Sequence, residues 1–275
     1  MLKRTPVSGG DINRAYVLDL SDESKVFVKA NRAGNRVFFR AEEEGLDAIR
    51  KTETVRVPKV LGRGVNSDDS FLVMEYIERG YGDRKSSEEL GRGLAMMHMA
   101  DASEYVNDGA FGFAYDNYIG AAPQINTPKE KWVDFFAECR LAPQFQRASS
   151  YFSTSERKDI ESFLCRLDRY LTKPDRPSLL HGDLWAGNYM IDAEGHPWLI
   201  DPATYVGHPE ADIAMTELFG GFDSAFYSAY AEVAGIDPEY KDRKDLYNLY
   251  HLLNHLNLFG SGYLGSVKSI LKRYV

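Results

Sequence analysis

The feature that most constrains the fold of this 275-residue chain is a change of pattern at about residue 77. Before that point, short apolar runs alternate with polar, turn-forming segments, which is typical of antiparallel strands joined by tight turns. The elements predicted here are strands over residues 15–20, 25–30 and 71–74, a helix over residues 36–50 and a glycine-rich turn over residues 62–64. The first 77 residues therefore predict a small β-rich lobe.

After Gly80 the apolar residues recur with a helical period. Ser86 and Glu89 have the spacing of a capping box, and the run Thr127-Pro128-Lys129-Glu130 predicts a second helix start. Two apolar stripes follow, formed by Trp132, Phe135, Phe136 and Cys139 and by Ile160, Phe163, Leu164, Leu167 and Leu171. We predict a two-lobed α+β fold, with a small N-terminal lobe over residues 1–77 and a larger, mainly helical C-terminal lobe over residues 78–275.

The composition excludes several classes of protein. With 33 Lys and Arg against 41 Asp and Glu, the net charge of −8 argues against a nucleic-acid binder. No apolar run approaches the ~18 residues of a membrane span, and the first ten residues lack the apolar core of a signal peptide, so we predict a cytoplasmic protein without a membrane segment. Cys139 and Cys165 form no CxxC pattern and are interpreted as free, buried thiols, although a disulfide in an oxidising compartment stays open.

The stretch His181-Gly-Asp-Leu-Trp-Ala-Gly-Asn188 carries the main chemical signal. Asp183 and Asn188 match the H-x-D-x-x-x-x-N catalytic loop of protein-kinase-like phosphotransferases, in which a carboxylate accepts the proton of the acceptor hydroxyl. Asp201 follows an apolar strand 13 residues after Asn188, and the turn predicted over residues 192–195 would bring these two potential Mg²⁺ ligands together. Taken alone, the Asp183–Asn188 spacing also fits a surface loop with a capping aspartate.

Upstream residues support the catalytic interpretation. Lys29 ends the apolar run of residues 26–28, which is the place of a strand lysine that holds nucleotide phosphates. Glu42 lies 13 residues later on the predicted helix and could orient Lys29 through an ion pair. Each residue alone also fits a solvated surface position. All four elements in the expected order favour a phosphotransferase.

Together these motifs resemble the fructosamine kinase (ketosamine-3-kinase) family, within the wider aminoglycoside-phosphotransferase and choline-kinase group. The core pattern of Asp183 and Asn188 is shared by many small-molecule kinases, whereas Trp185 and the run Phe219-Gly-Gly-Phe222 narrow the choice to this family. The resemblance extends over almost the whole chain, at residues 9–16, 27–29, 39–46, 111–113, 116–120, 124, 132–141, 181–188, 201–203, 207–210 and 212–222.

The resemblance implies a protein-kinase-like fold and an enzyme that uses ATP and Mg²⁺. The implied reaction is phosphorylation of the 3-hydroxyl of a ketosamine, such as a fructosamine or ribulosamine adduct, either free or bound to a protein. Because the resulting phosphate ester would make the adduct labile, the implied biological role is deglycation repair. Such an enzyme has a small-molecule or protein-bound ketosamine as its partner, and either a monomer or a homodimer stays open.

Site residues are carried over position by position. The resemblance makes Asp183 the catalytic base, Asn188 and Asp201 the Mg²⁺ ligands, Lys29 a contact of the ATP phosphates and Glu42 its ion-pair partner. It also implies that Gly9 and Gly10 belong to the phosphate loop, that Glu75, Tyr76 and Ile77 in the hinge hold adenine through backbone groups, and that Trp185 offers a flat apolar face to the sugar. The run Ser8-Gly9-Gly10-Asp11 departs from the G-x-G-x-x-G of protein kinases, since Asp11 would repel phosphates unless it turned away.

Several polar residues are interpreted as structural. Glu210 and Asp212 are expected to tie the catalytic loop to the following helix, and His181 to bond nearby backbone. His98 lies on an apolar stripe and is expected in the core. His251 and His255, one helical turn apart, are interpreted as a core or interface pair, because they lack the glutamate and third ligand of a zinc site.

Two alternatives remain open at this level. The first is a kinase for another hydroxyl compound, an aminoglycoside or a choline-like alcohol, for which Glu75, Glu78 and Asp83 near the hinge give faint support. The second is a catalytically silent scaffold that binds nucleotide. Against the scaffold, every expected catalytic position is filled.

Overall fold

A computed structural model describes residues 2–7 and 13–275, so the predicted phosphate-loop residues Gly9 and Gly10 lie outside the described residues. The chain divides into two compact units. The first comprises Met1–Met97, Gly187–Ala203 and Asp223–Val233, and the second comprises His98–Ala186, Thr204–Phe222 and Ala234–Val275. The predicted boundary after residue 77 divides an ATP-binding lobe from a catalytic lobe, and this functional division stays a prediction.

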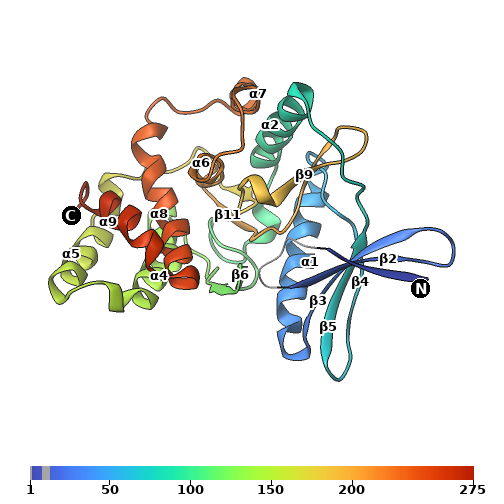
Figure 1. Cartoon of the computed structure of the whole chain (residues 1–275). Coiled ribbons are helices and arrows are strands. Elements are labelled where there is room, and N and C mark those ends of the chain that lie inside the picture. The colour runs from blue at the N-terminus through green and yellow to red at the C-terminus, as the bar shows by residue number, and fades with distance from the viewer. Residues whose placement is uncertain (1, 8–12) are drawn as a thin grey trace. The chain divides into compact units, whose positions relative to one another are not determined.

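The first unit is built on a five-stranded antiparallel sheet with the strand order β1-β2-β3-β5-β4 (Figure 1). Its strands are β1 (Lys3–Val7), β2 (Arg14–Asp19), β3 (Lys25–Arg32), β4 (Val60–Val65) and β5 (Asp69–Glu75). Helix α1 (Arg36–Lys51) contacts β4 and β5 and buries Phe39, Leu46 and Ile49. The predicted hairpin of residues 15–30, the helix over residues 36–50 and the strand at residues 71–74 are confirmed.

The predicted turn at Gly62 and Gly64 is wrong, because both glycines lie within β4. Gly64 is paired with Phe71 on β5, and a Cβ atom at Gly64 would collide with the Phe71 ring. Glycine in a strand can mark a close approach of a neighbouring group rather than a turn. Here it leaves room for an aromatic ring that lies across the strand.

The rest of the first unit consists of most of α2 (Arg84–Met99), the hairpin of β9 (Tyr189–Ile191) and β10 (Pro197–Leu199), and α7 (Ser224–Ala234). The helix cap predicted at Ser86 is wrong by three residues. Asp83 caps the helix instead, since its Oδ1 accepts the backbone N–H groups of Lys85 at 2.8 Å and Ser86 at 3.1 Å. The predicted turn between β9 and β10 is confirmed, because the two strands pair antiparallel across it.

The second unit is mainly helical, and its longest helix, α8, packs against α4, α6 and α9. Its helices are α3 (Trp132–Phe135), α4 (Ala142–Arg147), α5 (Thr154–Leu164), α6 (Glu210–Leu218), α8 (Tyr240–Phe259) and α9 (Leu264–Leu271), with a π-helical turn at Phe136–Leu141. Two small antiparallel sheets pair β6 (Asn117–Ile119) with β7 (Ala122–Gln124) and β8 (Ser178–Leu180) with β11 (Tyr205–Gly207). Within the described residues, no helix is both long and apolar enough to cross a membrane.

The helix start predicted at Thr127 is also wrong, because the helix begins at Trp132. The preceding residues are extended, and Lys129 exchanges backbone hydrogen bonds of 2.9 and 3.0 Å with Phe111. A competing strand-like pairing therefore overrides the capping pattern. The first predicted apolar stripe is confirmed, since Trp132, Phe135, Phe136 and Cys139 are all buried.

Both cysteines are free thiols, as predicted, but only Cys139 is buried. Cys165 is exposed at the C-terminal end of α5. The buried residues of α5 are Ile160 and Phe163, so position 165 falls on a different face of the helix. The prediction of two buried thiols is therefore wrong for Cys165.

Candidate active site

The first unit brings together three charged side chains from distant parts of the sequence. Lys29 lies within β3 and is buried, and its Nζ donates a hydrogen bond of 2.6 Å to Oε1 of Glu42 on α1. The same Nζ also donates to Oδ1 of Asp201, which follows β10. The ion pair predicted between Lys29 and Glu42 is confirmed. The contact with Asp201 was not predicted, and no local pattern reveals it because 172 positions separate the two residues.

This Lys29–Glu42–Asp201 cluster holds one more carboxylate than cations. Burial lowers the pKa of Lys29, but Asp201 and Glu42 outweigh it and leave the pKa raised. Burial raises the pKa of Glu42, an effect that Lys29 opposes and Asp201 reinforces. The Asp201 side chain is 44% exposed. When both carboxylates are ionised, the cluster carries one surplus negative charge, and Asp201 is the member that a cation from solvent could reach to balance it.

The β9–β10 hairpin places Asn188 beside Asp201, as the sequence predicts. Asn188 directly precedes β9, and its carbonyl oxygen accepts the N–H of Ile200 at 2.9 Å, which closes the open end of the hairpin. Asp201 comes next and has a φ of +56°. A left-handed conformation is uncommon for a residue other than glycine and is found preferentially at functional sites.

In the second unit, the loop that carries Asp183 is held by a buried carboxylate. Asp212 on α6 accepts the backbone N–H of His181 at 2.7 Å and that of Gly182 at 2.8 Å, and its Oδ2 lies 3.2 Å from Nε2 of His98. Burial raises the pKa of Asp212, but the hydrogen bonds from His98 and Gly182 outweigh it and lower the pKa. The predicted role of Asp212, tying this loop to the next helix, is confirmed.

The two histidines near Asp183 are structural. Nδ1 of His181 accepts the backbone N–H of Asp183 at 3.3 Å, which confirms the predicted bond to nearby backbone. His98 is buried and bonded to Asp212, as expected of a core residue. Asp183 itself is half-buried. Its charge acts on α8, where burial raises the pKa of Tyr250 and Asp183 raises it further.

Glu210 is structural, as interpreted, but the predicted tie to the catalytic loop is wrong. Its carboxylate binds Arg243 of α8 through two hydrogen bonds of 2.9 and 2.5 Å, so it ties α6 to α8 instead of to the catalytic loop. This pair is buried, and the two hydrogen bonds to one guanidinium give it a fixed geometry. The sequence gives no signal for it, because Arg243 lies 33 positions downstream in another helix.

The hinge residues and Trp185 occupy distinct surroundings. Glu75 ends β5 and its carboxylate accepts the backbone N–H of Lys59 at 2.6 Å, while Tyr76 and Ile77 are half-buried. In the second unit, Trp185 is 39% exposed and meets the ring of Phe219 edge-on at 6.3 Å. The proposed contacts of these residues with adenine and sugar stay predictions.

His251 and His255 belong to the packing of α8, as interpreted. His251 is buried, and burial lowers its pKa to about 3, so the imidazole is neutral. His255 stacks on Phe219 with a centroid distance of 4.9 Å. Across the described residues, no three or more His, Cys, Asp or Glu side chains gather where they could hold a metal ion.

Solved structures identify the class of protein. Two proteins assigned as fructosamine-3-kinases superpose on the chain. The one from Haemophilus somnus has a TM-score of 0.87 at 28% identity, covering 99% of this chain and 91% of that one. The one from Thermobifida fusca has a TM-score of 0.86 at 32% identity, covering 98% and 92%. An aminoglycoside phosphotransferase in a ternary complex with AMP-PNP and hygromycin B shares the fold alone, with a TM-score of 0.65 at 15% identity and coverage of 98% and 93%. The predicted two-lobed, protein-kinase-like α+β fold is confirmed.

Sequence comparison then gives the family. The family model named Fructosamine kinase matches residues 1–275. A probable ketoamine kinase of Synechocystis sp. is 43% identical over 98% of this chain and 90% of its own length. The chloroplastic protein-ribulosamine 3-kinase of Arabidopsis thaliana is 41% identical over 98% of this chain and 81% of its own. The chain belongs to the fructosamine kinase family, and the predicted enzyme class, an ATP-dependent kinase with an alcohol group as acceptor, is confirmed.

Proposed function

We propose that this protein transfers the γ-phosphoryl group of ATP to the 3-hydroxyl of a ketosamine, a fructosamine or ribulosamine carried on an amine. The observation that carries the proposal is the Lys29–Glu42–Asp201 cluster beside Asn188, in a chain that matches the fructosamine kinase family over its full length. The phosphate ester at the 3-position would make the adduct labile, which gives the reaction a role in deglycation.

Asp183 is the base in this proposal. Its carboxylate accepts the proton of the 3-hydroxyl while the hydroxyl oxygen forms a bond to the γ-phosphorus, and the bond between that phosphorus and the ADP oxygen breaks. Proton transfer of this kind needs a carboxylate within hydrogen-bond reach of the hydroxyl. The backbone N–H groups of the two residues before Asp183, His181 and Gly182, donate hydrogen bonds to the Asp212 carboxylate and fix the loop, which supports this role.

Lys29 binds the ATP phosphates in this proposal. Its ammonium group is fixed between two carboxylates, so the cation is oriented before the nucleotide arrives. Electrostatic groups that are oriented in advance stabilise a developing charge better than mobile ones, because they do not have to reorganise during the reaction. Glu42 takes part by holding Lys29 in place.

Asn188 and Asp201 would hold Mg²⁺. One amide and one carboxylate oxygen suit a hard cation, and Mg²⁺ is commonly bound through one or two carboxylates together with substrate phosphates and water. The surplus negative charge of the Lys29–Glu42–Asp201 cluster and the open side of Asp201 fit such an ion. When bound, Mg²⁺ neutralises negative charge on the phosphate oxygens during transfer.

The remaining assignments complete the proposal. Gly9 and Gly10 lie along the phosphates, and the backbone of Glu75, Tyr76 and Ile77 holds adenine. The exposed ring of Trp185 packs on the sugar. Two free thiols, one of them exposed, support a reducing compartment such as the cytoplasm.

The test is ADP formation from ATP and Mg²⁺ with four acceptors: ribulosyl-lysine, fructosyl-lysine, an aminoglycoside and choline. We expect turnover with the two ketosamines only, and turnover about 10³-fold lower with the Asp183→Asn variant, which serves as the control. Turnover confined to the aminoglycoside or choline would keep the kinase chemistry and reject the acceptor. ATP binding without turnover on any acceptor would favour the nucleotide-binding scaffold.

A further inference from the structure

The two potential Mg²⁺ ligands flank one short hairpin at its open end. Contacts that fix the hairpin therefore also fix the distance between these two residues. Asn188 precedes β9 and Asp201 follows β10, and each strand has three residues. The base of the hairpin is closed by the hydrogen bond of 2.9 Å between Ile200 N–H and the Asn188 carbonyl. Three residues per strand leave little pairing to hold the register, so other contacts must supply it.

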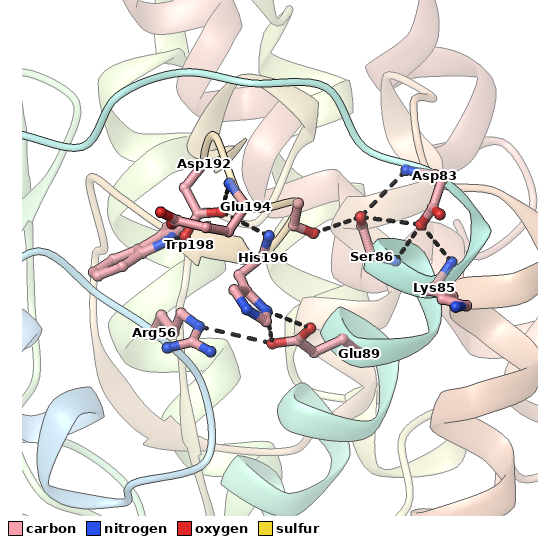
Figure 2. Close-up of polar contacts among 10 residues, drawn as sticks. Arg56, Asp83, Lys85, Ser86, Glu89, Asp192, Glu194, His196 and Trp198 are labelled. Atoms are coloured by element: carbon pink, nitrogen blue, oxygen red, sulfur yellow. Dashed lines mark hydrogen bonds and ion pairs between the residues drawn. The ribbon is translucent and has the colours of Figure 1, made fainter.

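A buried carboxylate in the turn supplies three such contacts (Figure 2). Asp192 is 6% exposed, and its Oδ1 accepts the backbone N–H of Glu194 at 3.0 Å and that of His196 at 2.8 Å. Its Oδ2 accepts the indole N–H of Trp198, in the middle of β10, at 2.7 Å. One side chain thus fixes both the loop of the turn and the strand that leads to Asp201.

The turn is also attached to the segment after the hinge. Gly80 N–H donates to the carbonyl of Ile191 at 2.9 Å, and a Cβ atom at Gly80 would collide with the carbonyl oxygen of Asp192. The Ser86 hydroxyl donates to the carbonyl of Gly195 at 2.6 Å (Figure 2). Backbone therefore packs directly on backbone at this side of the turn.

The β10 side of the hairpin is attached to the segment after α1. Leu199 N–H donates to the carbonyl of Arg56 at 2.8 Å, and the Arg56 guanidinium lies 6.0 Å from the centre of the Trp198 ring. Nδ1 of His196 lies 2.9 Å from Oε2 of Glu89, a carboxylate that also faces Arg56 (Figure 2). The side chains of Arg56, Glu89 and His196 are exposed, whereas Asp192 is buried and Trp198 is half-buried.

We propose that Asp192 is a positioning residue for phosphoryl transfer, which holds Trp198 and the turn so that Asn188 and Asp201 keep the separation that Mg²⁺ needs. The proposal rests on the proposed function, because that function makes Asn188 and Asp201 the metal ligands. Asp192 touches neither of them and acts through the hairpin. Burial raises the pKa of Asp192, but hydrogen bonds from Trp198 and the turn outweigh it, so the carboxylate stays charged and its bonds are of the stronger, charge-assisted kind.

Asp192→Asn is the sharpest variant, since it keeps the volume of the side chain. In either orientation of the amide, its NH₂ group faces an N–H group, of Trp198 or of the turn backbone. Trp198→Phe removes the indole donor from the other side. Asp22→Asn is the matched control, because Asp22 also accepts a backbone N–H in a hairpin turn, that of Ser24 in the turn between β2 and β3.

We expect Asp192→Asn to raise the Mg²⁺ concentration for half-maximal turnover about tenfold, the usual effect of removing a partner that orients a metal ligand. Turnover at saturating Mg²⁺ should change much less. In a Trp198→Phe background the indole donor is gone, so the new amide can turn its oxygen toward the backbone N–H groups of the turn while its NH₂ group meets no donor. Asp192→Asn should therefore have a smaller effect in that background. Asp22→Asn should leave the Mg²⁺ dependence unchanged.

A second readout needs neither metal nor nucleotide. Amide hydrogen exchange across residues 186–201 should be faster in Asp192→Asn than in the unmodified protein, and Asp22→Asn should leave it unchanged. Unaltered exchange in this segment would reject the positioning role. Faster exchange and lower stability with an unchanged Mg²⁺ dependence would also reject it, because Asp192 would then only stabilise the fold. An Asp201→Asn variant with normal Mg²⁺ dependence would instead reject the metal site of the proposed function, whatever Asp192 does.

Discussion

Each unit contains a group of charged side chains, and the two groups differ in how far the protein itself neutralises their charge. In the first unit, Lys29, Glu42 and Asp201 face one another, the charges do not sum to zero, and Asp201 is open to solvent. In the second unit, Asp212 is fully enclosed and its charge is met by two backbone N–H groups and His98. One centre is completed within the chain, and the other has room for a ligand to complete it.

The difference distinguishes a carboxylate that can bind a ligand from one that holds a loop in place. A carboxylate whose hydrogen bonds are all made within the protein contributes to stability and fixes a loop, but it has little left to offer a ligand. A carboxylate that shares one lysine with a second carboxylate keeps a binding capacity. The comparison predicts that substitutions in the Lys29–Glu42–Asp201 cluster mainly lower activity. Substitution of Asp212, which holds the loop of Asp183, should mainly lower stability.

The largest effect is expected at the loop that Asp212 supports. Asp183→Asn should lower turnover about 10³-fold, because the amide cannot accept the proton of the acceptor hydroxyl. ATP binding and thermal unfolding should stay close to those of the unmodified enzyme, which equilibrium binding and calorimetry can establish. Near-normal turnover would remove Asp183 from the role of base.

Lys29→Met tests the first unit and should lower turnover about 10²-fold. The substitution removes the cation and leaves Glu42 and Asp201 without the charge that they share. The loss should appear in the KM for ATP as well as in kcat, since Lys29 is expected to bind the phosphates before transfer. Steady-state kinetics with varied ATP provide the measurement, and an unchanged KM and kcat would contradict the assignment.

Asp212→Asn and Asp201→Asn compare how much each carboxylate contributes to the free energy of unfolding. The amide can face only one of the two backbone N–H groups with its oxygen, so one buried donor loses its partner, and we expect a loss of about 2 kcal/mol in the free energy of unfolding. Asp201→Asn, at a half-exposed ion pair, should change this free energy by less than about 1 kcal/mol. Urea unfolding of both variants measures the difference, and equal losses would erase the contrast between the two centres.

A further effect concerns the pH dependence of stability, and it arises in the second unit. Burial lowers the pKa of His208 from 6.5 to about 3, with Arg243 contributing in the same direction. The unfolded chain therefore binds a proton more readily than the folded one between these values. The contribution of His208 to stability is complete above pH 6.5 and declines as the pH falls toward 3. His208→Gln should flatten the fall of unfolding free energy between pH 6.5 and 4.5, and an unchanged slope would contradict this origin.

How much the sequence could predict depends on how far apart the interacting residues are. The hairpin that joins Asn188 to Asp201 and the pair of Lys29 with Glu42 follow from patterns within 13 positions. The contact of Lys29 with Asp201 spans 172 positions, and that of Glu210 with Arg243 joins two helices. Such contacts depend on how elements pack, which a local pattern does not contain. Local signals also failed at Thr127, where pairing of Lys129 with Phe111 overrides a capping sequence.

The most direct test of the open centre is ATP binding by the unmodified protein and by Asp201→Asn, each with and without Mg²⁺. We expect Mg²⁺ to tighten ATP binding by the unmodified protein and to have little effect on the variant, while both proteins unfold at similar temperatures. If Mg²⁺ tightens binding equally in both, Asp201 does not complete a cation site, and the surplus charge beside Lys29 has another purpose.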